Sequence, residues 1–238
     1  MNLSFEKFGN ISSEDEIRAK EAFEKAATDL EKEWNLSSSL EVSVHLMSNE
    51  KFREGAKETD PASWRYCFLM HDPKDKRVYI NVAIFSILPN EAASMIKHEL
   101  AHVVINEIIG DLKYKISYRK SYPFHEGFAG FENATRLLIE KIKKEKIRSI
   151  PDPLFIDSME KIKQLGGDSN KEPFNRQLGY LVIFSFAQFL KEKHGVGKII
   201  EIYKGINDKT SFADSYRDVC KGDLGEVSEV WKKSIIRL

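Results

Sequence analysis

The fold of this chain is decided around residues 89–110, which read PNEAASMIKHELAHVVINEIIG. Pro89 and Asn90 form a helix-start signature, and Gly110 follows the last apolar turn as a stop signal. Between them the apolar residues recur at helical spacing. This pattern predicts one helix with an apolar packing surface, and the most informative side chains of the chain lie on it.

A pair of histidines lies inside this predicted helix, in the string His98-Glu99-Leu100-Ala101-His102. Residues four apart on a helix share one face, so both imidazoles can reach a single ion at the ~2.0 Å that zinc prefers. Glu99 is rotated by about 100° from His98 and is placed to act as a general base toward a water that zinc activates. The spacing therefore predicts a catalytic zinc site.

A third ligand is expected, because catalytic zinc takes three protein ligands and leaves one position open. The best candidate is Glu126, in the segment Phe124-His125-Glu126-Gly127-Phe128-Ala129. His125 is the alternative and would give a site of three histidines, but the HExxHxxGxxH string of such sites is absent, since positions 105 and 106 are Ile and Asn. We favour Glu126 as ligand and place His125 beside the ligands or in the substrate site. Glu132 is interpreted as a surface carboxylate or as a support for a ligand imidazole.

The HExxH string followed by Glu126-Gly127-Phe128-Ala129 resembles the gluzincin zinc peptidases of the peptidase MA-like superfamily. In that family an EGxA-type motif donates the glutamate ligand, and here Glu126 falls 24 residues after His102. The resemblance covers roughly residues 40–238. It implies a zincin-like fold with a cleft between its halves, Zn²⁺ as cofactor, a peptide or protein substrate, and peptide-bond hydrolysis with Glu99 as general base.

The same resemblance suggests residues that touch the substrate. Tyr180, fifteen residues before Gly195, is nominated as the donor to the oxyanion, with a core aromatic residue as the alternative. Residues 77–82 occupy the place of the strand that edges the cleft, so Tyr79 and Asn81 are expected to bind substrate by strand pairing, with an interior strand as the alternative. The amine-capturing GxMxN motif of the aminopeptidase branch is absent from the sequence. This absence counts against an aminopeptidase.

The rest of the pattern indicates an α+β protein. Three strands are predicted at residues 40–47, 66–70 and 77–82, together forming a small antiparallel sheet that shares the N-terminal half with the active-site helix. The chain is divided into an N-terminal packing helix (1–38), a zincin-like catalytic half (39–150) and a helical C-terminal half (151–238). Helices are expected over most of the first 35 residues, from near 123 to 146, and near 154–163, 174–193, 196–205, 211–220 and 225–236.

The composition of the chain argues against two classes of binding partner, nucleic acid and membranes. The 37 basic and 37 acidic side chains cancel, so no global field favours nucleic acid or a membrane surface. The N-terminal residues lack a signal peptide and no window approaches ~18 apolar residues, which predicts a cytoplasmic protein unless a leader has been removed. Cys67 and Cys220 are interpreted as buried free thiols, with a single disulfide between them as the alternative, and His45, His71 and His194 as structural or exposed. Oligomeric state is left open.

Two functions besides peptide hydrolysis stay open at this point. The first is a zinc-binding module without peptidase activity, in which the metal stabilises the fold or recognises a partner. The second is hydrolysis of a non-peptide amide. The residues do not show which substrate sequence is preferred. They also do not show whether a peptide would be cleaved at its ends or internally.

Overall fold

The computed structural model of the 238-residue chain describes residues 1–36, 40–57, 69–72, 75–110, 122–130, 133–157, 159–165 and 177–236. The chain divides into two compact units, Met1–Glu107 and Ile108–Leu238. Strands and helices both occur, and helices predominate. The mixed composition of α and β elements is thus confirmed, while the boundary between the units falls inside the segment 39–150.

A four-stranded sheet in the order β1-β2-β4-β3 forms the base of the first unit. The strands β1 (Asn2–Phe8), β2 (Glu41–Met47) and β4 (Arg77–Asn81) are parallel, and only β3 (Leu69–Asp72) runs antiparallel to its neighbour β4. The predicted antiparallel sheet is therefore wrong. A helix between β1 and β2 carries the chain back to the same end of the sheet, and such a crossover makes the two strands parallel.

The strand β1 lies where the sequence predicted only a helix. Its side chains alternate, with Leu3 and Phe5 half-buried between exposed polar residues. The N-terminal helix α1 (Ser13–Trp34) does form, and the hydroxyl of its N-cap Ser12 accepts a hydrogen bond from the Asp15 backbone N–H at 3.1 Å. Seven residues of a half-exposed edge strand carry little hydrophobic signal beside a 22-residue amphipathic helix, which explains the omission.

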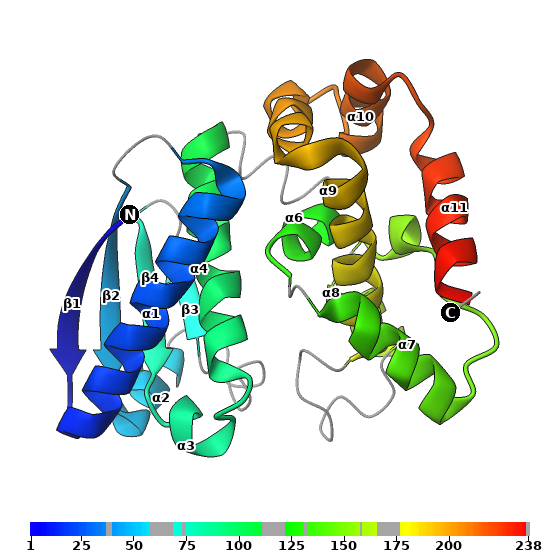
Figure 1. The fold of residues 1–238 in the computed structure, drawn as a ribbon. Helices are drawn as coiled ribbons and strands as arrows, with labels where there is room; N and C mark the ends of the chain where they lie inside the picture. The colour runs from blue at the N-terminus through cyan, green and yellow to red at the C-terminus, as the bar shows by residue number, and fades with distance from the viewer. Residues whose placement is uncertain are drawn as a thin grey trace. The chain divides into compact units, whose positions relative to one another are not determined.

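The core of the first unit lies on one face of the sheet. Alternate residues of β2 and β4 form this face. Helices α1 and α4 (Ala92–Ile109) run alongside the sheet in Figure 1, and Lys97 of α4 forms an ion pair with Glu33 of α1 at 3.0 Å. The short helices α2 (Asn49–Lys57) and α3 (Ile84–Ile87) complete the unit. The buried apolar side chains include Phe23, Leu30, Trp34, Val42, Val44, Leu46, Val78, Ile80, Ile96 and Leu100.

The strand β4 is an interior strand, paired with β2 on one side and β3 on the other. The hypothesis that residues 77–82 form an edge strand is therefore wrong, and the interior alternative is the one observed. Its main-chain hydrogen-bonding groups are engaged by neighbouring strands, so an extended peptide cannot pair with β4 as it would with an open edge.

The second unit is organised around the long helix α9 (Leu178–Gly205), which Figure 1 shows in yellow and gold. Gly195 interrupts it with φ +77°, at the position where the sequence predicted two helices. The surrounding elements are α6 (Tyr122–Phe128), α7 (Ala134–Glu145), the 3-10 turn η2 (Pro153–Phe155), α8 (Met159–Leu165), α10 (Phe212–Cys220) and α11 (Leu224–Ile236), and each of them contacts α9. The single helix predicted from 123 to 146 is in fact two helices, α6 and α7.

Buried polar side chains join the helices of this unit. The Ser185 hydroxyl of α9 accepts a hydrogen bond from the Trp231 indole N–H of α11 at 3.2 Å and lies 2.9 Å from the Thr135 hydroxyl of α7. Ser185 is fully buried, so these partners meet its hydrogen-bonding requirement away from water.

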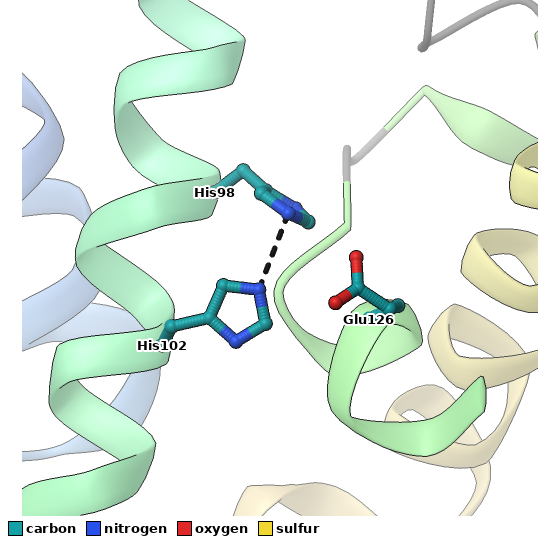
Figure 2. A group of neighbouring side chains, drawn as sticks. All are labelled: His98, His102 and Glu126. Atoms are coloured by element: carbon teal, nitrogen blue, oxygen red, sulfur yellow. Dashed lines mark hydrogen bonds between the residues drawn. The ribbon is translucent and has the colours of Figure 1, made fainter. Parts of the chain in front are cut away.

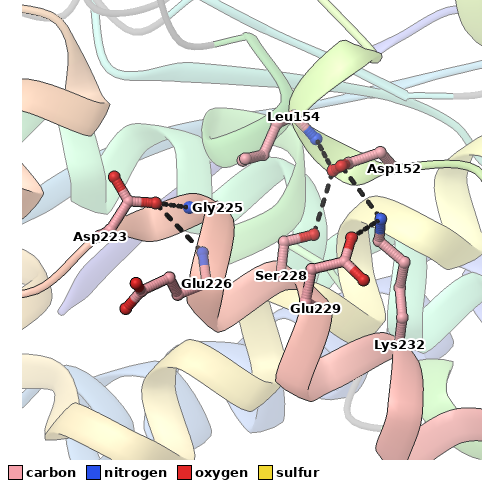
Figure 3. Close-up of polar contacts among 8 residues, drawn as sticks. All are labelled: Asp152, Leu154, Asp223, Gly225, Glu226, Ser228, Glu229 and Lys232. Carbon is pink, nitrogen blue, oxygen red and sulfur yellow. Dashed lines mark hydrogen bonds and ion pairs between the residues drawn. The ribbon is translucent and has the colours of Figure 1, made fainter.

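A second polar contact attaches α11 to the turn before α8, as Figure 3 shows. The carboxylate of Asp152 accepts hydrogen bonds from the Leu154 backbone N–H and the Ser228 hydroxyl, both at 3.0 Å, and pairs with Lys232 at 3.1 Å. Asp223 accepts from the backbone N–H groups of Gly225 and Glu226 at the start of α11. The carboxylate of Asp152 thus joins the turn to α11, and the carboxylate of Asp223 accepts from backbone N–H groups at the first turn of the same helix.

Within the part of the chain that the structure describes, no helix has the length and apolar character needed to cross a membrane. Cys220 is a free thiol, as predicted, but it is half-buried and not buried as expected. Cys67, Glu132 and the first three residues of the strand predicted at 66–70 lie outside the described residues.

Candidate metal centre

Helix α4 places His98 and His102 one turn apart on the same face, as Figure 2 shows. Both imidazoles are buried, with 3% and 1% of their surface exposed. Their Nε2 atoms lie 3.2 Å apart and the rings are nearly perpendicular. The helical spacing of the HExxH string thus brings two imidazole nitrogens together in the interior of the protein.

The distance between these nitrogens fits two arrangements. A neutral imidazole can donate a hydrogen bond from its protonated nitrogen to the other ring, and 3.2 Å is within reach of such a bond. Two nitrogens that each lie ~2.05 Å from a tetrahedral ion are themselves about 3.3 Å apart. The rings are therefore already spaced as zinc requires, and little rearrangement is needed to exchange the hydrogen bond for metal coordination.

Glu126 supplies the carboxylate of the group. It lies on α6 and is 6% exposed. One ligand atom from each of His98, His102 and Glu126 lies within 4.8 Å of the other two, close enough for all three to bind one metal ion. Two imidazole nitrogens and one carboxylate oxygen are a donor set that catalytic zinc uses. Among the described residues, His125 does not belong to this group.

The position of α6 depends on Gly127. A Cβ atom at this residue would lie 2.7 Å from the Cβ of Ala187 and 2.8 Å from the backbone oxygen of Ile183, both on α9. Only a residue without a side chain allows the two helices to approach this closely. The glycine of the EGxA-type segment therefore sets how Glu126 is held against α9.

Glu99 follows His98 on α4 and is half-buried. Its burial contrasts with that of the two histidines, because Glu99 points about 100° away from His98 around the helix axis. Glu99 therefore keeps partial access to solvent, whereas the two histidines do not. Its role as a general base stays a prediction.

His125 is fully buried in the second unit, where its ring meets the ring of Tyr203 edge-on at 5.1 Å between centroids. Tyr180 is 2% exposed and packs against Phe184 at 5.5 Å between ring centroids. This packing agrees with the core-aromatic alternative for Tyr180. Its role as oxyanion donor, and that of His125 in substrate binding, stay predictions.

Tyr79 and Asn81 lie on the interior strand β4. Tyr79 is half-buried and contacts the ring of His45 on β2 edge-on. Asn81 is 3% exposed, donates to Asn49 Oδ1 at 2.9 Å and accepts from the Ala83 backbone N–H at 3.1 Å. The side chain of Asn81 therefore organises the turn after β4. Substrate binding by these two residues is no longer supported by an edge position.

Two further residues were not singled out by sequence reasoning. Asn106 lies one turn after His102 on α4 and is 4% exposed, and its spacing of four residues was a signal that could have identified it. Tyr203 lies near the end of α9 and is 1% exposed. Nothing in its neighbouring sequence distinguishes it from a core aromatic residue, so only the packing of α9 against α6 reveals it.

Comparison of the chain with protein-family models, with curated proteins and with solved structures gave no match. Functional assignment therefore depends on the residues and their geometry.

Proposed function

We propose that this protein is a zinc-dependent hydrolase of peptide bonds, with His98, His102 and Glu126 as metal ligands. The observation that carries the proposal is the group of three buried donors, two of them from an HExxH string, within 4.8 Å of one another. Membership of the gluzincins and a zincin-like fold are part of the same proposal. They are supported by the HExxH helix and the EGxA-type segment that follows it.

Each side chain has a definite task in this proposal. Bound at the three donors, zinc would polarise a substrate carbonyl and acidify a water molecule. Glu99 accepts the proton of the attacking water and returns it to the leaving amine. His98 and His102 would supply imidazole nitrogens as ligands, and the carboxylate of Glu126 would be the third ligand and offset part of the charge of the ion. Tyr180 is the proposed donor to the oxyanion.

The decisive variant is Glu99→Gln, which keeps the size of the side chain and removes its basicity. We expect it to retain zinc at wild-type stoichiometry and to lose at least about 100-fold in turnover, the low end of what general acid–base catalysis contributes. Metal content is measured on the purified full chain. Turnover is measured by digestion of a broad peptide library with and without a chelator.

The control is Glu107→Gln, a change at an exposed position of α4 where Glu107 pairs with Lys76 at 2.7 Å. Its peptide products and its metal content should match those of the wild type. Peptidase activity in Glu99→Gln at the level of this control would exclude the proposed general base.

A second function is favoured by one observation, the burial of the three donors. His98, His102 and Glu126 are each at most 6% exposed, so a metal held there would be shielded from solvent, as a metal that stabilises the fold would be. A zinc-binding module without peptidase activity would show stoichiometric zinc and no chelator-sensitive product from the library. Because the sequence has no amine-capturing motif, we do not propose an aminopeptidase.

A further inference from the structure

Tyr203 carries a buried hydroxyl to which no other described residue is hydrogen-bonded. The residue is 1% exposed, and among the described residues its hydroxyl has no hydrogen-bond partner. Tyr216 is buried to the same extent, but its hydroxyl lies 2.8 Å from His194 Nε2 and is satisfied. A buried hydroxyl without a partner costs free energy, so its presence requires an explanation.

The surroundings of the Tyr203 ring are aromatic. Phe128 and Phe212 meet it edge-on, with ring centroids 5.8 and 5.7 Å away. A phenylalanine would preserve these contacts and avoid the unsatisfied hydroxyl. The packing among the described residues of the second unit therefore accounts for the ring and leaves the oxygen unexplained.

The hydroxyl belongs to a residue that packs directly on α6, the helix of Glu126. Tyr203 contacts His125, the residue before Glu126, and Phe128, two residues after it. Burial, together with a smaller contribution from the negative charge of Glu126, raises the pKa of Tyr203 well above its usual value. The phenol is thus a buried hydrogen-bond donor beside the helix that carries the Glu126 carboxylate.

We propose that Tyr203 is a positioning residue that donates its hydroxyl to the Glu126 carboxylate when that carboxylate holds a metal ion. Ligating carboxylates are usually hydrogen-bonded in turn, and such a contact fixes which oxygen faces the ion. This inference rests on the proposed metal site. It adds a residue of α9 that controls metal affinity without touching the metal or the substrate.

The experiment compares Tyr203→Phe with the wild type in the full chain. Zinc affinity is measured by competition with a chelator, and the environment of the metal by the visible absorption spectrum after loading with Co²⁺. We expect zinc to bind 10–100-fold more weakly in Tyr203→Phe, as is typical for loss of a partner of a ligand, and the Co²⁺ spectrum to change. The melting temperature of the metal-free variant should equal or exceed that of the wild type.

Tyr216→Phe is the matched control, because it removes the hydroxyl of an equally buried tyrosine that has a partner. It should lower the melting temperature of the metal-free protein and leave zinc affinity unchanged. A structural role for the Tyr203 hydroxyl would instead give Tyr203→Phe the behaviour of this control.

The outcomes separate the two proposals. If the wild type binds zinc and Tyr203→Phe binds it equally well, or if the metal-free variant is markedly less stable, the positioning role is excluded and the metal site stands. If the wild type and Tyr216→Phe bind neither Zn²⁺ nor Co²⁺, the metal site and the positioning role are excluded together.

Discussion

At the scale of single residues, the position of Glu126 depends on the absence of a Cβ atom at the next residue, Gly127. Gly127 lets α6 approach the backbone of α9, where an added Cβ would lie 2.8 Å from the Ile183 oxygen. Backbone atoms of a long helix cannot move aside as the end of a flexible side chain can. Any side chain at position 127 must therefore displace α6 and the carboxylate it carries.

We expect Gly127→Ala to lower the free energy of unfolding by about 1–3 kcal/mol, the usual cost of overpacking a core contact. Zinc affinity should fall in the same variant, because α6 moves together with Glu126. Urea-induced unfolding measures the first effect and chelator competition the second.

The control for this variant is Gly197→Ala, at an exposed helical position of α9 where an added Cβ meets nothing within 4 Å. It should raise the free energy of unfolding by about 0.5–1 kcal/mol, because alanine favours the helix over glycine. Equal stabilisation by both substitutions would show that α6 and α9 are not in close contact at Gly127.

The histidine pair could be predicted from sequence because four residues make about one helical turn, so the spacing alone puts both rings on one face. Glu126 could be proposed only through resemblance to a family motif. Tyr203 was beyond prediction, because its relevance depends on contact with a helix about 80 residues earlier in the chain.

At the scale of elements, one carboxylate joins the unpredicted strand β1 to helix α1. Glu16 of α1 lies 2.8 Å from Lys7 of β1 and 2.8 Å from Lys20 one turn further along α1. Hydrogen bonds from Lys20 and then Lys7 lower the pKa of Glu16 from 4.5 to about 2. The folded protein therefore binds a proton at Glu16 less readily than the unfolded chain does.

This shift has a defined sign in the dependence of stability on pH. The contribution of Glu16 is fully present above pH 4.5 and is lost as the pH falls from there through about 2. We expect Glu16→Gln to unfold with a shallower loss of stability over that interval, as measured by chemical denaturation at a series of pH values.

Glu14→Gln is the comparison for this prediction, because Glu14 pairs with Arg18 within α1, at an exposed position. The free energy of unfolding of Glu14→Gln should change with pH in the same way as that of the wild type between pH 4.5 and about 2. Parallel pH profiles for wild type and Glu16→Gln would mean that the contact between β1 and α1 through Lys7 is not maintained in solution.

Most helices could be predicted because an amphipathic pattern and a cap are local features, as Ser12 and α1 illustrate. The direction of the strands could not be predicted, because alternation of apolar and polar residues shows that a segment is extended but does not show which strand it pairs with. The strands β2 and β4 were identified correctly as strands. Both strands pair in parallel, β2 with β1 and with β4, and the sequence reasoning missed β1 altogether.

At the scale of the whole molecule, a metal that binds only the folded protein must stabilise it. With free zinc at 100 times the dissociation constant, the added stability is about 2.7 kcal/mol. For a chain of 238 residues we expect a rise in melting temperature of about 5–10 °C, reversed by a chelator. Thermal unfolding monitored by circular dichroism measures the shift.

His102→Ala should abolish this shift, because it removes one of the three donors. His45→Ala should retain it, because His45 is on β2, is not a member of the donor group, and contacts Phe8 and Tyr79 instead. An undiminished zinc shift in His102→Ala would place the bound metal at other residues.

The sequence by itself determined that two imidazoles share one face of a helix with a carboxylate beside them, because helix geometry converts a spacing of four residues into a position in space. Only the tertiary structure decided that the sheet is mainly parallel, that Glu126 lies within reach of both histidines, and that Tyr203 is buried against α6. These features depend on packing between segments far apart in the chain. Local propensity does not encode such contacts, since they are selected by the burial and close packing of the whole core.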